Sequence, residues 1–375
     1  MRVLSIFGTR PEAIKMSPVI KELSKRDGIE SVVCVTAQHR QMLDQVLSAF
    51  NIVPDYDLNI MQESQSLSEI TVHVLSTLDL VVKEVAPDII LVHGDTTTTF
   101  AASLCAFYNG VLLGHVEAGL RTYNKHSPFP EEVNRQLTSV VADFHFAPTE
   151  YARDNLIREG KDPEKIIVTG NTAIDALSTT ILKEYTHPLI ESIGDDRMIL
   201  FTAHRRENIG DIMSHIFRSV LKIVEEFNDV HLVYPVHLNP LVRKLAYDVF
   251  GDDENRNPRI HLLEPLDVID FHNFMARSYF IMSDSGGIQE EAPSLGKPVL
   301  VLRDTTERPE GVRAGTLKLT GLGEDDVYNT AKILLEDREV YESMANSINP
   351  YGDGHSSEYI VDYLEKYFSR YHFKW

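Results

Sequence analysis

Cysteine and long apolar runs are scarce in this chain. Its 375 residues include two cysteines, Cys34 and Cys105, and both lie in apolar surroundings. Two such cysteines provide neither a disulfide framework nor the spacing of a metal site, and they suit a reducing compartment. Residues 1–8 are too short for the apolar region of a signal peptide, and no later run is long enough to span a bilayer. We therefore expect a cytoplasmic protein with no membrane partner.

Basic residues are also few. The chain has 36 Lys and Arg against 56 Asp and Glu, which gives a formal net charge of −20. This charge argues against nucleic acid and anionic membranes as main partners, because both repel an acidic protein. An acidic protein that binds an anion must gather its cations locally. Arginines and lysines near glycine-rich corners are therefore candidate phosphate ligands.

Several catalytic signatures are absent. No Gly-x-Gly-x-x-Gly follows the apolar run 3–7, so we expect no bound dinucleotide, and no Gly-x-x-x-x-Gly-Lys-Ser/Thr of a P-loop enzyme occurs. Ser285 lacks the glycine two positions earlier that a nucleophile elbow requires. His93, His115 and His126 have no His-x-x-x-His or Cys/His spacing, so the sequence predicts no metal site.

Apolar runs that alternate with helical patterns are what the chain does contain. The first series of runs is 3–7, 32–35, 89–92, 112–116 and 144–147, and the second is 198–201, 232–234, 260–262, 279–282 and 299–302. Such alternation is typical of parallel sheets covered by helices on both faces. The length and the 43% hydrophobic content suit two domains. We therefore predict an α/β protein of two doubly wound, Rossmann-like domains.

The turn-like segment 168–172 separates the two series. We expect a first domain over residues 1–169, a second over 170–355, and an amphipathic C-terminal helix in 356–375 that returns to the first domain. Ligands of doubly wound sheets bind beyond the carboxyl ends of the strands. Two such sheets predict a site in a cleft between the domains.

A Ser-Gly-Gly corner in residues 283–291 is the most informative single stretch. It follows an apolar run and leads into a helical pattern that ends near Gly296. Backbone N–H groups of Ser285, Gly286 and Gly287 can converge on an anion, because glycine lets the backbone approach closely. Glu291 lies further along the helix, where it can accept hydrogen bonds from ribose hydroxyls. A nucleoside diphosphate fits this pattern, and an ordinary strand-to-helix turn is the alternative.

Polar residues stand at the carboxyl ends of the other predicted strands. Arg10 and Lys15 follow the first strand, Asp95 follows a later one, and Glu117 comes directly after another. Further candidates of this kind are Glu131, Arg135, His204 and Arg308. Each alone could be a helix cap or a surface ion pair. Their shared position favours a carboxylate-rich site that transfers protons on a bound sugar nucleotide.

Six motifs occur along the chain in one order. They are Gly8-Thr9-Arg10-Pro11-Glu12, His93-Gly94-Asp95-Thr96, His115-Val116-Glu117-Ala118-Gly119-Leu120-Arg121, Pro130-Glu131-Glu132-x-Asn134-Arg135, Thr202-x-His204-Arg205-Arg206-Glu207-Asn208 and Asp284-Ser285-Gly286-Gly287-x-Gln289-Glu290-Glu291. With these motifs the chain resembles the non-hydrolysing UDP-N-acetylglucosamine 2-epimerases of bacteria, over residues 2–365. The resemblance implies a GT-B architecture, a cytoplasmic homodimer, and interconversion of UDP-GlcNAc and UDP-ManNAc for cell-surface polysaccharides.

The resemblance also implies a mechanism. The proton on sugar C2 is not acidic, and the family eliminates UDP to give 2-acetamidoglucal and then adds UDP back. No nicotinamide cofactor or metal is required. By motif position Asp95, Glu117 and Glu131 are the acid/base candidates, with their assignment to the two faces of the sugar left open. His204 joins these three as a catalytic candidate.

Substrate-binding residues are implied in the same way. Arg10 and His204 would bind the diphosphate together with the backbone of the Ser-Gly-Gly corner. Leu266 and Phe271, at the ends of segment 266–271, would hold the uracil. The remaining members of this set are Lys15, Arg135, Ser285, Gly286, Gly287, Glu291 and Arg308.

Some members of the family bind a second UDP-GlcNAc that activates the enzyme. Gln38, Gln41, Arg205 and His237 match positions linked to that site. Where activated relatives carry an arginine in the loop 59–67, this chain has the sequence Met61-Gln62-Glu63-Ser64-Gln65. A plain polar helix face is the alternative for the two glutamines. For the whole chain, a hydrolysing epimerase, a GT-B glycosyltransferase and a non-catalytic UDP-sugar sensor are the alternatives.

Overall fold

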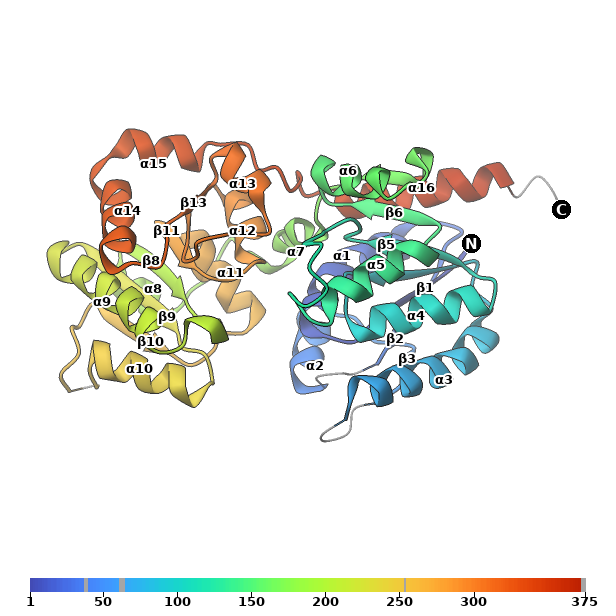
Figure 1. The fold of residues 1–375 in the computed structure, drawn as a ribbon, viewed down its shortest axis with the longest axis horizontal. Coiled ribbons are helices and arrows are strands. Elements are labelled where there is room, and N and C mark those ends of the chain that lie inside the picture. Colours follow the sequence, from blue (N-terminus) through green and yellow to red (C-terminus); the bar gives the residue numbers. More distant parts are fainter. Residues whose placement is uncertain (37–39, 61–64, 253, 372–375) are drawn as a thin grey trace. The chain divides into compact units, whose positions relative to one another are not determined.

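The computed structural model describes residues 1–36, 40–60, 65–252 and 254–371. The chain divides into two compact units (Figure 1). The first unit comprises Met1–Thr179 and Tyr351–Trp375, and the second comprises Thr180–Pro350. The domain boundaries predicted from the sequence lie at 169/170 and 355/356. Each unit is described by itself below.

The first unit contains a parallel sheet with strand order β3-β2-β1-β4-β5-β6-β7. Its strands are β1 (Arg2–Phe7), β2 (Glu30–Val35), β3 (Tyr56–Asp57), β4 (Ile89–His93), β5 (Leu112–Val116), β6 (Phe144–Ala147) and β7 (Ile166–Val168). Its helices are α1 (Arg10–Lys25), α2 (Arg40–Ala49), α3 (Leu67–Val85), α4 (Thr97–Tyr108), α5 (Glu131–Val141), α6 (Glu150–Arg158), α7 (Thr172–Thr180) and α16 (Ser356–Tyr371), with a short 3₁₀ helix η1 (Pro163–Lys165).

The second unit repeats this design with strand order β10-β9-β8-β11-β12-β13, again parallel. Its strands are β8 (Arg197–Thr202), β9 (Val230–Pro235), β10 (Ile260–Leu263), β11 (Phe280–Ser283), β12 (Val299–Val301) and β13 (Leu317–Leu319). Its helices are α8 (Pro188–Ile193), α9 (Asp211–Glu226), α10 (Pro240–Phe250), α11 (Val268–Arg277), α12 (Ile288–Glu291), α13 (Pro309–Ala314), α14 (Glu324–Glu336) and α15 (Arg338–Ala345), with 3₁₀ helices η2 (Arg206–Asn208) and η3 (Ala292–Leu295).

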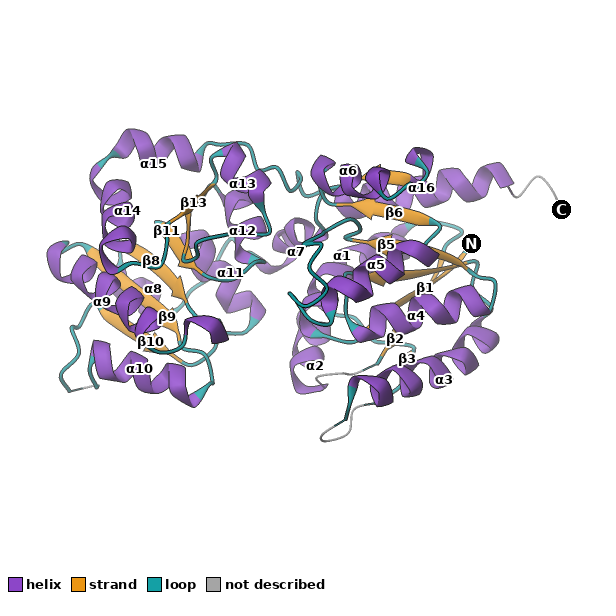
Figure 2. Ribbon diagram, viewed as in Figure 1, coloured by secondary structure: helices purple, strands orange, loops and turns teal. Residues whose placement is uncertain are grey.

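Helices enclose the sheet of each unit (Figure 2). The strands are buried on both faces, which is why they read as continuous apolar runs in the sequence. The prediction of two doubly wound, Rossmann-like sheets is confirmed. Sequence patterns missed β3, β7 and β13, because strands of two or three residues are too short to show a period. Within the described part of the chain, no helix combines the length and the apolar character needed to cross a bilayer.

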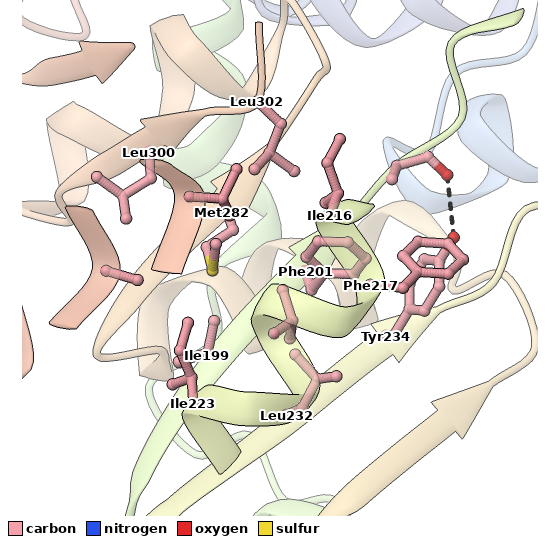
Figure 3. Packing of buried hydrophobic residues seen from close by; sticks show 14 of the residues in the cluster. Ile199, Phe201, Ile216, Phe217, Ile223, Leu232, Tyr234, Met282, Leu300 and Leu302 are labelled. Atoms are coloured by element: carbon pink, nitrogen blue, oxygen red, sulfur yellow. Dashed lines mark hydrogen bonds between the residues drawn. The ribbon is translucent and has the colours of Figure 1, made fainter. Parts of the chain in front are cut away.

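Aromatic side chains fill the core of the second unit (Figure 3). Phe201 on β8, Phe217 on α9 and Tyr234 on β9 are fully buried, and the rings of Phe201 and Tyr234 meet edge to face at 4.7 Å. The buried Tyr234 hydroxyl donates a hydrogen bond of 3.0 Å to the carbonyl oxygen of Ala203. This bond satisfies the polar end of the ring and holds the backbone just before His204.

The C-terminal helix α16 belongs to the first unit. The side chain of Asp175 accepts hydrogen bonds from the backbone N–H groups of Ser356 (3.2 Å) and Ser357 (2.7 Å), and it thereby caps the helix from a distant part of the chain. Further along the helix, Asp362 forms an ion pair of 2.8 Å with Arg26, which directly follows α1. Residues 351–371 are therefore fixed to the first sheet and its helices.

Strand order reverses once in each sheet, between β1 and β4 in the first unit and between β8 and β11 in the second. The loops that follow these strands diverge at the reversal and leave room for a ligand. Most of the sequence-predicted site residues lie in or beside these loops. Each unit therefore carries one group of these residues, which we call a half-site.

Candidate active site

Glu12 joins the loops that follow β1 and β4. Its buried carboxylate accepts hydrogen bonds from the backbone N–H groups of Gly8 (3.0 Å) and Thr9 (2.7 Å), and from the hydroxyls of Thr96 (2.7 Å) and Thr99 (2.9 Å). The bond from the Thr9 N–H is one half of a capping box between Thr9 and Glu12, which fixes the start of α1. The bonds to the threonines attach that start to the first turn of α4. Arg10 begins α1, so this network also sets the position of its backbone.

Glu117 adopts a strained backbone directly after β5. Its φ is +62°, a left-handed conformation that is uncommon outside glycine. The Glu117 carboxylate forms an ion pair with Lys15 of α1 through Oε2. The same oxygen accepts a hydrogen bond of 2.9 Å from the side-chain amide of Asn171. A carboxylate held in this way has a defined orientation before any substrate binds.

His93 at the end of β4 lies beside this carboxylate. Its Nε2 is 3.7 Å from Oε2 of Glu117, and the side chain is 4% exposed. Burial lowers the pKa of His93 to about 4, although the nearby Glu117 opposes this shift. Neither ring nitrogen has a hydrogen-bond partner among the described residues. A neutral imidazole therefore borders the Glu117 site at physiological pH.

Asp95 forms an ion pair with Arg135 of α5, with 2.6 Å between Oδ2 and a guanidinium nitrogen. The backbone carbonyl of Asp95 accepts a hydrogen bond of 3.0 Å from the side chain of Asn134. Burial raises the pKa of Asp95 to about 6; Arg135 opposes this rise, and the negative charges of Glu117 and Glu131 add to it. An acid that titrates near pH 6 can hold or release a proton under physiological conditions.

Glu132 fixes the loop that leads to α5. Its carboxylate is fully buried and accepts hydrogen bonds from the backbone N–H groups of Thr122 (2.9 Å) and Tyr123 (3.0 Å). The fully buried side chain of Arg121 forms an ion pair of 2.7 Å with Glu159, which directly follows α6. These contacts fix the segment between Glu117 and Glu131. They thereby help to hold the carboxylate cluster of Asp95, Glu117 and Glu131 in place.

His204 and Asp284 form the centre of the second half-site. They follow β8 and β11, the two strands at the reversal, and Nδ1 of His204 lies 2.8 Å from Oδ1 of Asp284. The other carboxylate oxygen accepts hydrogen bonds from the backbone N–H groups of His204 (2.7 Å) and Arg205 (2.9 Å). Asp284 is 1% exposed, whereas the His204 side chain is 42% exposed. The buried carboxylate therefore orients an imidazole that faces solvent.

Asp284 also changes the charge of this imidazole. Its contact with Asp284 raises the pKa of His204, although partial burial opposes this rise. Burial would raise the pKa of Asp284, but the His204 side chain and the backbone N–H groups outweigh it and lower that pKa. The ring of His237 stacks on His204 with centroids 5.7 Å apart, and burial together with the His204 charge lowers the pKa of His237. His204 is thus a cation-capable donor suited to a phosphate oxygen.

The Ser-Gly-Gly corner is tightly bordered by charged side chains. A Cβ on Gly286 would lie 2.6 Å from a guanidinium nitrogen of Arg308, so a larger residue there would push the end of this arginine aside. Arg308 donates a hydrogen bond of 2.7 Å to Glu290. A Cβ on Gly287 would lie 3.6 Å from Oε1 of Glu291, which places that carboxylate directly above the corner.

The helical stretch after the corner ends at Gly296 as predicted, but it is not one α-helix. It consists of the four-residue α12 and the 3₁₀ helix η3, which contains Pro293. Proline has no N–H to continue the α-helical bonding, and the 3₁₀ turn follows from that. The four-residue α12 has only a small helix dipole, so an anion at this corner would depend on backbone N–H groups and on Arg308.

Phe271 lies on α11 next to His272, and Leu266 immediately precedes this helix. Nε2 of the buried His272 is 3.5 Å from Oε2 of Glu291, and its Nδ1 is 2.7 Å from the hydroxyl of Thr180. The structure therefore joins segment 266–271 to the helix of the Ser-Gly-Gly corner through one histidine.

A small cavity of about 160 Å³ lies beside this half-site, within the second unit. Its lining consists of residues from the loops after β8, β12 and β13, namely Arg205, Glu207, Asn208, Arg303, Asp304, Thr305 and Leu322. Glu307 receives a bidentate ion pair from Arg303 at 2.6 and 2.9 Å, and Arg303 lowers the pKa of Glu307 to about 2 against the effect of burial. The arginines here are largely neutralised by carboxylates.

The structure brings most sequence-predicted residues into two groups. In the first unit Lys15, Asp95, Glu117, Glu131 and Arg135 gather at the carboxyl ends of β4 and β5, with Arg10 at the start of α1. In the second unit, the other group follows β8, β9, β11 and β12 and consists of His204, Arg205, His237, Ser285, Gly286, Gly287, Glu291 and Arg308. Phe271 lies on α11 and Leu266 just before this helix, and His272 of the same helix contacts Glu291. Gln38 and residues 61–64 lie outside the described residues, and so does the side chain of Gln41 in α2.

The sequence patterns did not single out three residues that lie against candidate catalytic side chains: His93 and Asn171 beside Glu117, and Asp284 beside His204. His93 and Asp284 each stand at or beside a strand end within a recognised motif, so their position was a usable signal. Asn171 lies in the segment that was read only as a domain crossing, and nothing local connects it with Glu117. Among the described residues, no group of three or more His, Cys, Asp or Glu side chains is arranged to hold a metal ion.

Comparison with known proteins gives a consistent result. The family model for UDP-N-acetylglucosamine 2-epimerase matches residues 21–365. The UDP-N-acetylglucosamine 2-epimerase of Bacillus subtilis is 62% identical over 364 residues, which cover 97% of this chain and 95% of that protein. The enzyme of the same name from Neisseria meningitidis is 54% identical over 376 residues, covering 98% of this chain and 100% of that protein.

Solved structures agree in fold. A crystal structure of a putative UDP-N-acetylglucosamine 2-epimerase from Listeria monocytogenes has a TM-score of 0.93 at 56% identity, covering 98% of this chain and 97% of that one. The Neisseria meningitidis UDP-GlcNAc 2-epimerase bound to UDP-GlcNAc has a TM-score of 0.88 at 53% identity, with 98% and 100% covered. These likenesses confirm the predicted GT-B class. The family model and the full-length relatives together show that the chain belongs to the UDP-N-acetylglucosamine 2-epimerase family of isomerases.

Proposed function

We propose that this protein interconverts UDP-GlcNAc and UDP-ManNAc without hydrolysis, by eliminating UDP and adding it back. In the first step a base removes the proton from C2, the bond from C1 to the UDP oxygen breaks, and its electron pair leaves with UDP. The C1–C2 double bond of 2-acetamidoglucal results. In the second step an acid returns a proton to C2 on the opposite face, and the UDP oxygen bonds to C1 again.

The carboxylate cluster is the observation that carries this proposal. Burial raises the pKa of Asp95 to about 6, and the charges of the Lys15-paired Glu117 and of Glu131 add to this rise while Arg135 opposes it. Proton removal on one face and proton delivery on the other require two or more such groups with different proton affinities. The route needs no redox cofactor and no metal.

Departure of UDP requires stabilisation of the phosphate charge. We assign this role to His204, to the backbone N–H groups of the Ser-Gly-Gly corner, and to Arg10 and Arg308. Glu291 would bind the ribose hydroxyls, and segment 266–271 would hold the uracil. Support comes from relatives, because the Neisseria meningitidis enzyme binds UDP-GlcNAc and the Methanocaldococcus jannaschii enzyme, 34% identical with a TM-score of 0.80, binds UDP-GlcNAc and UDP.

A second UDP-GlcNAc is proposed to bind near Arg205 and His237 and to activate the enzyme. Arg205 donates through its Nε to the carbonyl oxygen of Asp284 at 3.0 Å, and His237 stacks on His204. A ligand on either residue would thus affect the pair His204 and Asp284 directly. Gln38 and Gln41 belong to the same proposal.

The protein is further proposed to act in the cytoplasm as a homodimer that supplies ManNAc units for cell-surface polysaccharide. One face of the first unit carries exposed apolar side chains on α3, α4 and α5, which lie side by side (Figure 1). They include Val72, Leu80, Phe107, Tyr108 and Val140, each between 61% and 68% exposed. Exposed apolar side chains on neighbouring helices favour association, and we assign this surface of α3, α4 and α5 to a second copy of the chain. Light scattering of the purified protein tests the dimer.

The reaction is tested by incubating the protein with UDP-GlcNAc in deuterated water and following the sugars by NMR. We expect UDP-ManNAc with deuterium at C2. Full retention of the original hydrogen would rule out elimination and re-addition. Release of free ManNAc would identify a hydrolysing epimerase, transfer of the sugar to an acceptor a glycosyltransferase, and an unchanged substrate a UDP-sugar sensor.

A further inference from the structure

Asn171 lies beside Glu117 although 54 positions separate them in the chain. It follows β7 and precedes α7, in a segment whose sequence predicted only a turn. Its side-chain amide donates a hydrogen bond of 2.9 Å to Oε2 of Glu117. The same oxygen is paired with Lys15 and lies 3.7 Å from Nε2 of His93. Three groups from three separate elements thus surround one oxygen of the carboxylate.

The orientation of the Asn171 amide is fixed by its own hydrogen bonds. Its Oδ1 accepts a bond of 3.0 Å from the backbone N–H of Ala173, in the first turn of α7. This bond identifies the other end of the amide as the donor, because an N–H cannot accept. Rotation of the side chain would break both bonds together. The donor therefore points at Glu117 and cannot turn away cheaply.

The backbone of Asn171 is held equally firmly. Its N–H donates a hydrogen bond of 2.6 Å to the carbonyl oxygen of Tyr351. Gly170 and Gly352 meet so closely that a Cβ on Gly170 would lie 3.0 Å from the Cα of Gly352. Asn171 therefore occupies a fixed point at which the two chain segments of the first unit come together.

Glu117 needs such a support more than an ordinary glutamate does. Its left-handed φ of +62° costs energy, so the contacts around it must hold the residue in this conformation. The ion pair with the flexible side chain of Lys15 stabilises the charge of the Glu117 carboxylate but does little to fix its orientation. A planar amide with a fixed donor supplies direction.

We propose that Asn171 is a positioning residue of the epimerase reaction, which holds Oε2 of Glu117 and so sets the direction in which this carboxylate exchanges a proton with the sugar. The inference rests on the proposed role of Glu117 in acid/base catalysis. Asn171 does not touch the substrate in this role. It acts through Glu117, as second partners of catalytic groups commonly do.

The variant Asn171→Ser tests the proposal. Serine keeps an oxygen that can cap α7, because Ser and Asn serve equally well at a helix start, but it is too short to reach Glu117. We expect kcat to fall about 10- to 100-fold, as for the loss of a hydrogen bond to a charged group, while KM and the affinity for UDP change less than about threefold. The limb of the pH profile that Glu117 controls should move to higher pH, because a lost donor disfavours the ionised carboxylate.

Asn257→Ser is the matched control. Asn257 lies in the second unit, and its side chain also accepts a hydrogen bond (3.0 Å) from the backbone N–H two residues later, that of Arg259. This variant should keep the wild-type kcat and pH profile. Where Asn171→Ser folds poorly, Asn171→Asp retains the capping oxygen and replaces the donor with a second negative charge, so its kcat should fall further at neutral pH and recover partly in acid.

Glu117→Gln separates failure of this inference from failure of the proposed function. Loss of turnover in Glu117→Gln together with wild-type kcat in Asn171→Ser overturns the inference alone. Normal turnover in Glu117→Gln overturns the catalytic role on which it rests. Asn171→Ser could also lower kcat together with Tm and leave the pH profile unchanged. That result would assign Asn171 a structural role and would also overturn the proposal.

Discussion

Arg135 and Asp95 form an ion pair with 2.6 Å between Nη2 and Oδ2, and this contact keeps a largely buried carboxyl group titratable. Burial alone would favour the protonated acid, and the guanidinium draws the pKa back to about 6. The sequence assigned Arg135 to substrate binding on the strength of its motif. Its place in the structure makes it first of all the partner of Asp95.

Removing this guanidinium should change the pH dependence of turnover. In wild type we expect an ionisation near pH 6 in the profile of kcat, and in Arg135→Gln we expect it at higher pH, because the opposing positive charge is gone. Arg153→Gln, which removes an exposed arginine paired with Glu150 at 2.8 Å, serves as the control and should leave the profile unchanged. An ionisation that stays near pH 6 in Arg135→Gln would contradict the assignment to Asp95.

The raised pKa of Asp95 also fixes the sign of its effect on stability. Its pKa in the folded protein, about 6, lies above the value of about 4 in an unfolded chain. Between these values the folded state binds more protons, so the free energy of unfolding falls as the pH rises from about 4 to about 6. In Asp95→Asn this contribution should disappear from urea unfolding curves measured across that range.

Amide replacement of the carboxylate cluster should abolish turnover and spare binding. Asp95→Asn, Glu117→Gln and Glu131→Gln keep the shape of each side chain and remove the base, so kcat should fall on the order of 100- to 10,000-fold. The affinity for UDP, measured by calorimetry, should change little, because the diphosphate ligands are elsewhere. A variant that eliminates UDP but cannot return the proton should release UDP and 2-acetamidoglucal. Near-normal epimerisation by all three variants would remove these residues from the mechanism.

His204 should control the affinity for UDP in a pH-dependent manner. Loss of its hydrogen bond to a phosphate oxygen in His204→Ala costs about 1.5–3 kcal/mol, which weakens UDP binding about 10- to 100-fold. Because Asp284 raises the pKa of His204, the imidazolium persists to higher pH than usual, and wild-type affinity should decline as the pH rises through that pKa. His355→Ala is the control, since Glu358 raises the pKa of this exposed histidine in the same way. Equal UDP affinity in His204→Ala and wild type would mean that His204 is not a diphosphate ligand.

Local sequence patterns determined much of this protein. The buried parallel strands were recognisable as continuous apolar runs, for example residues 89–92 of β4, because both faces of such strands are shielded from water. The residues after those strands could be assigned to one edge of a sheet, because the carboxyl ends of parallel strands lie at the same edge. The Ser-Gly-Gly corner was recognisable because two consecutive glycines between an apolar run and a helical pattern are typical of a place where the backbone can approach an anion closely.

Only the tertiary structure decided which side chains meet. His204 and Asp284 are 80 positions apart, and they are neighbours because β8 pairs with the distant strand β11 on one side, while it pairs with β9, the next strand along the chain, on the other. Asn171 reaches Glu117 because β7 and β5 end at the same edge of the first sheet. Strand order and register depend on the packing of the whole unit, which no local pattern encodes. The pKa of Asp95 depends on them too, since burial and the charges of Arg135, Glu117 and Glu131 act together only once the chain has folded.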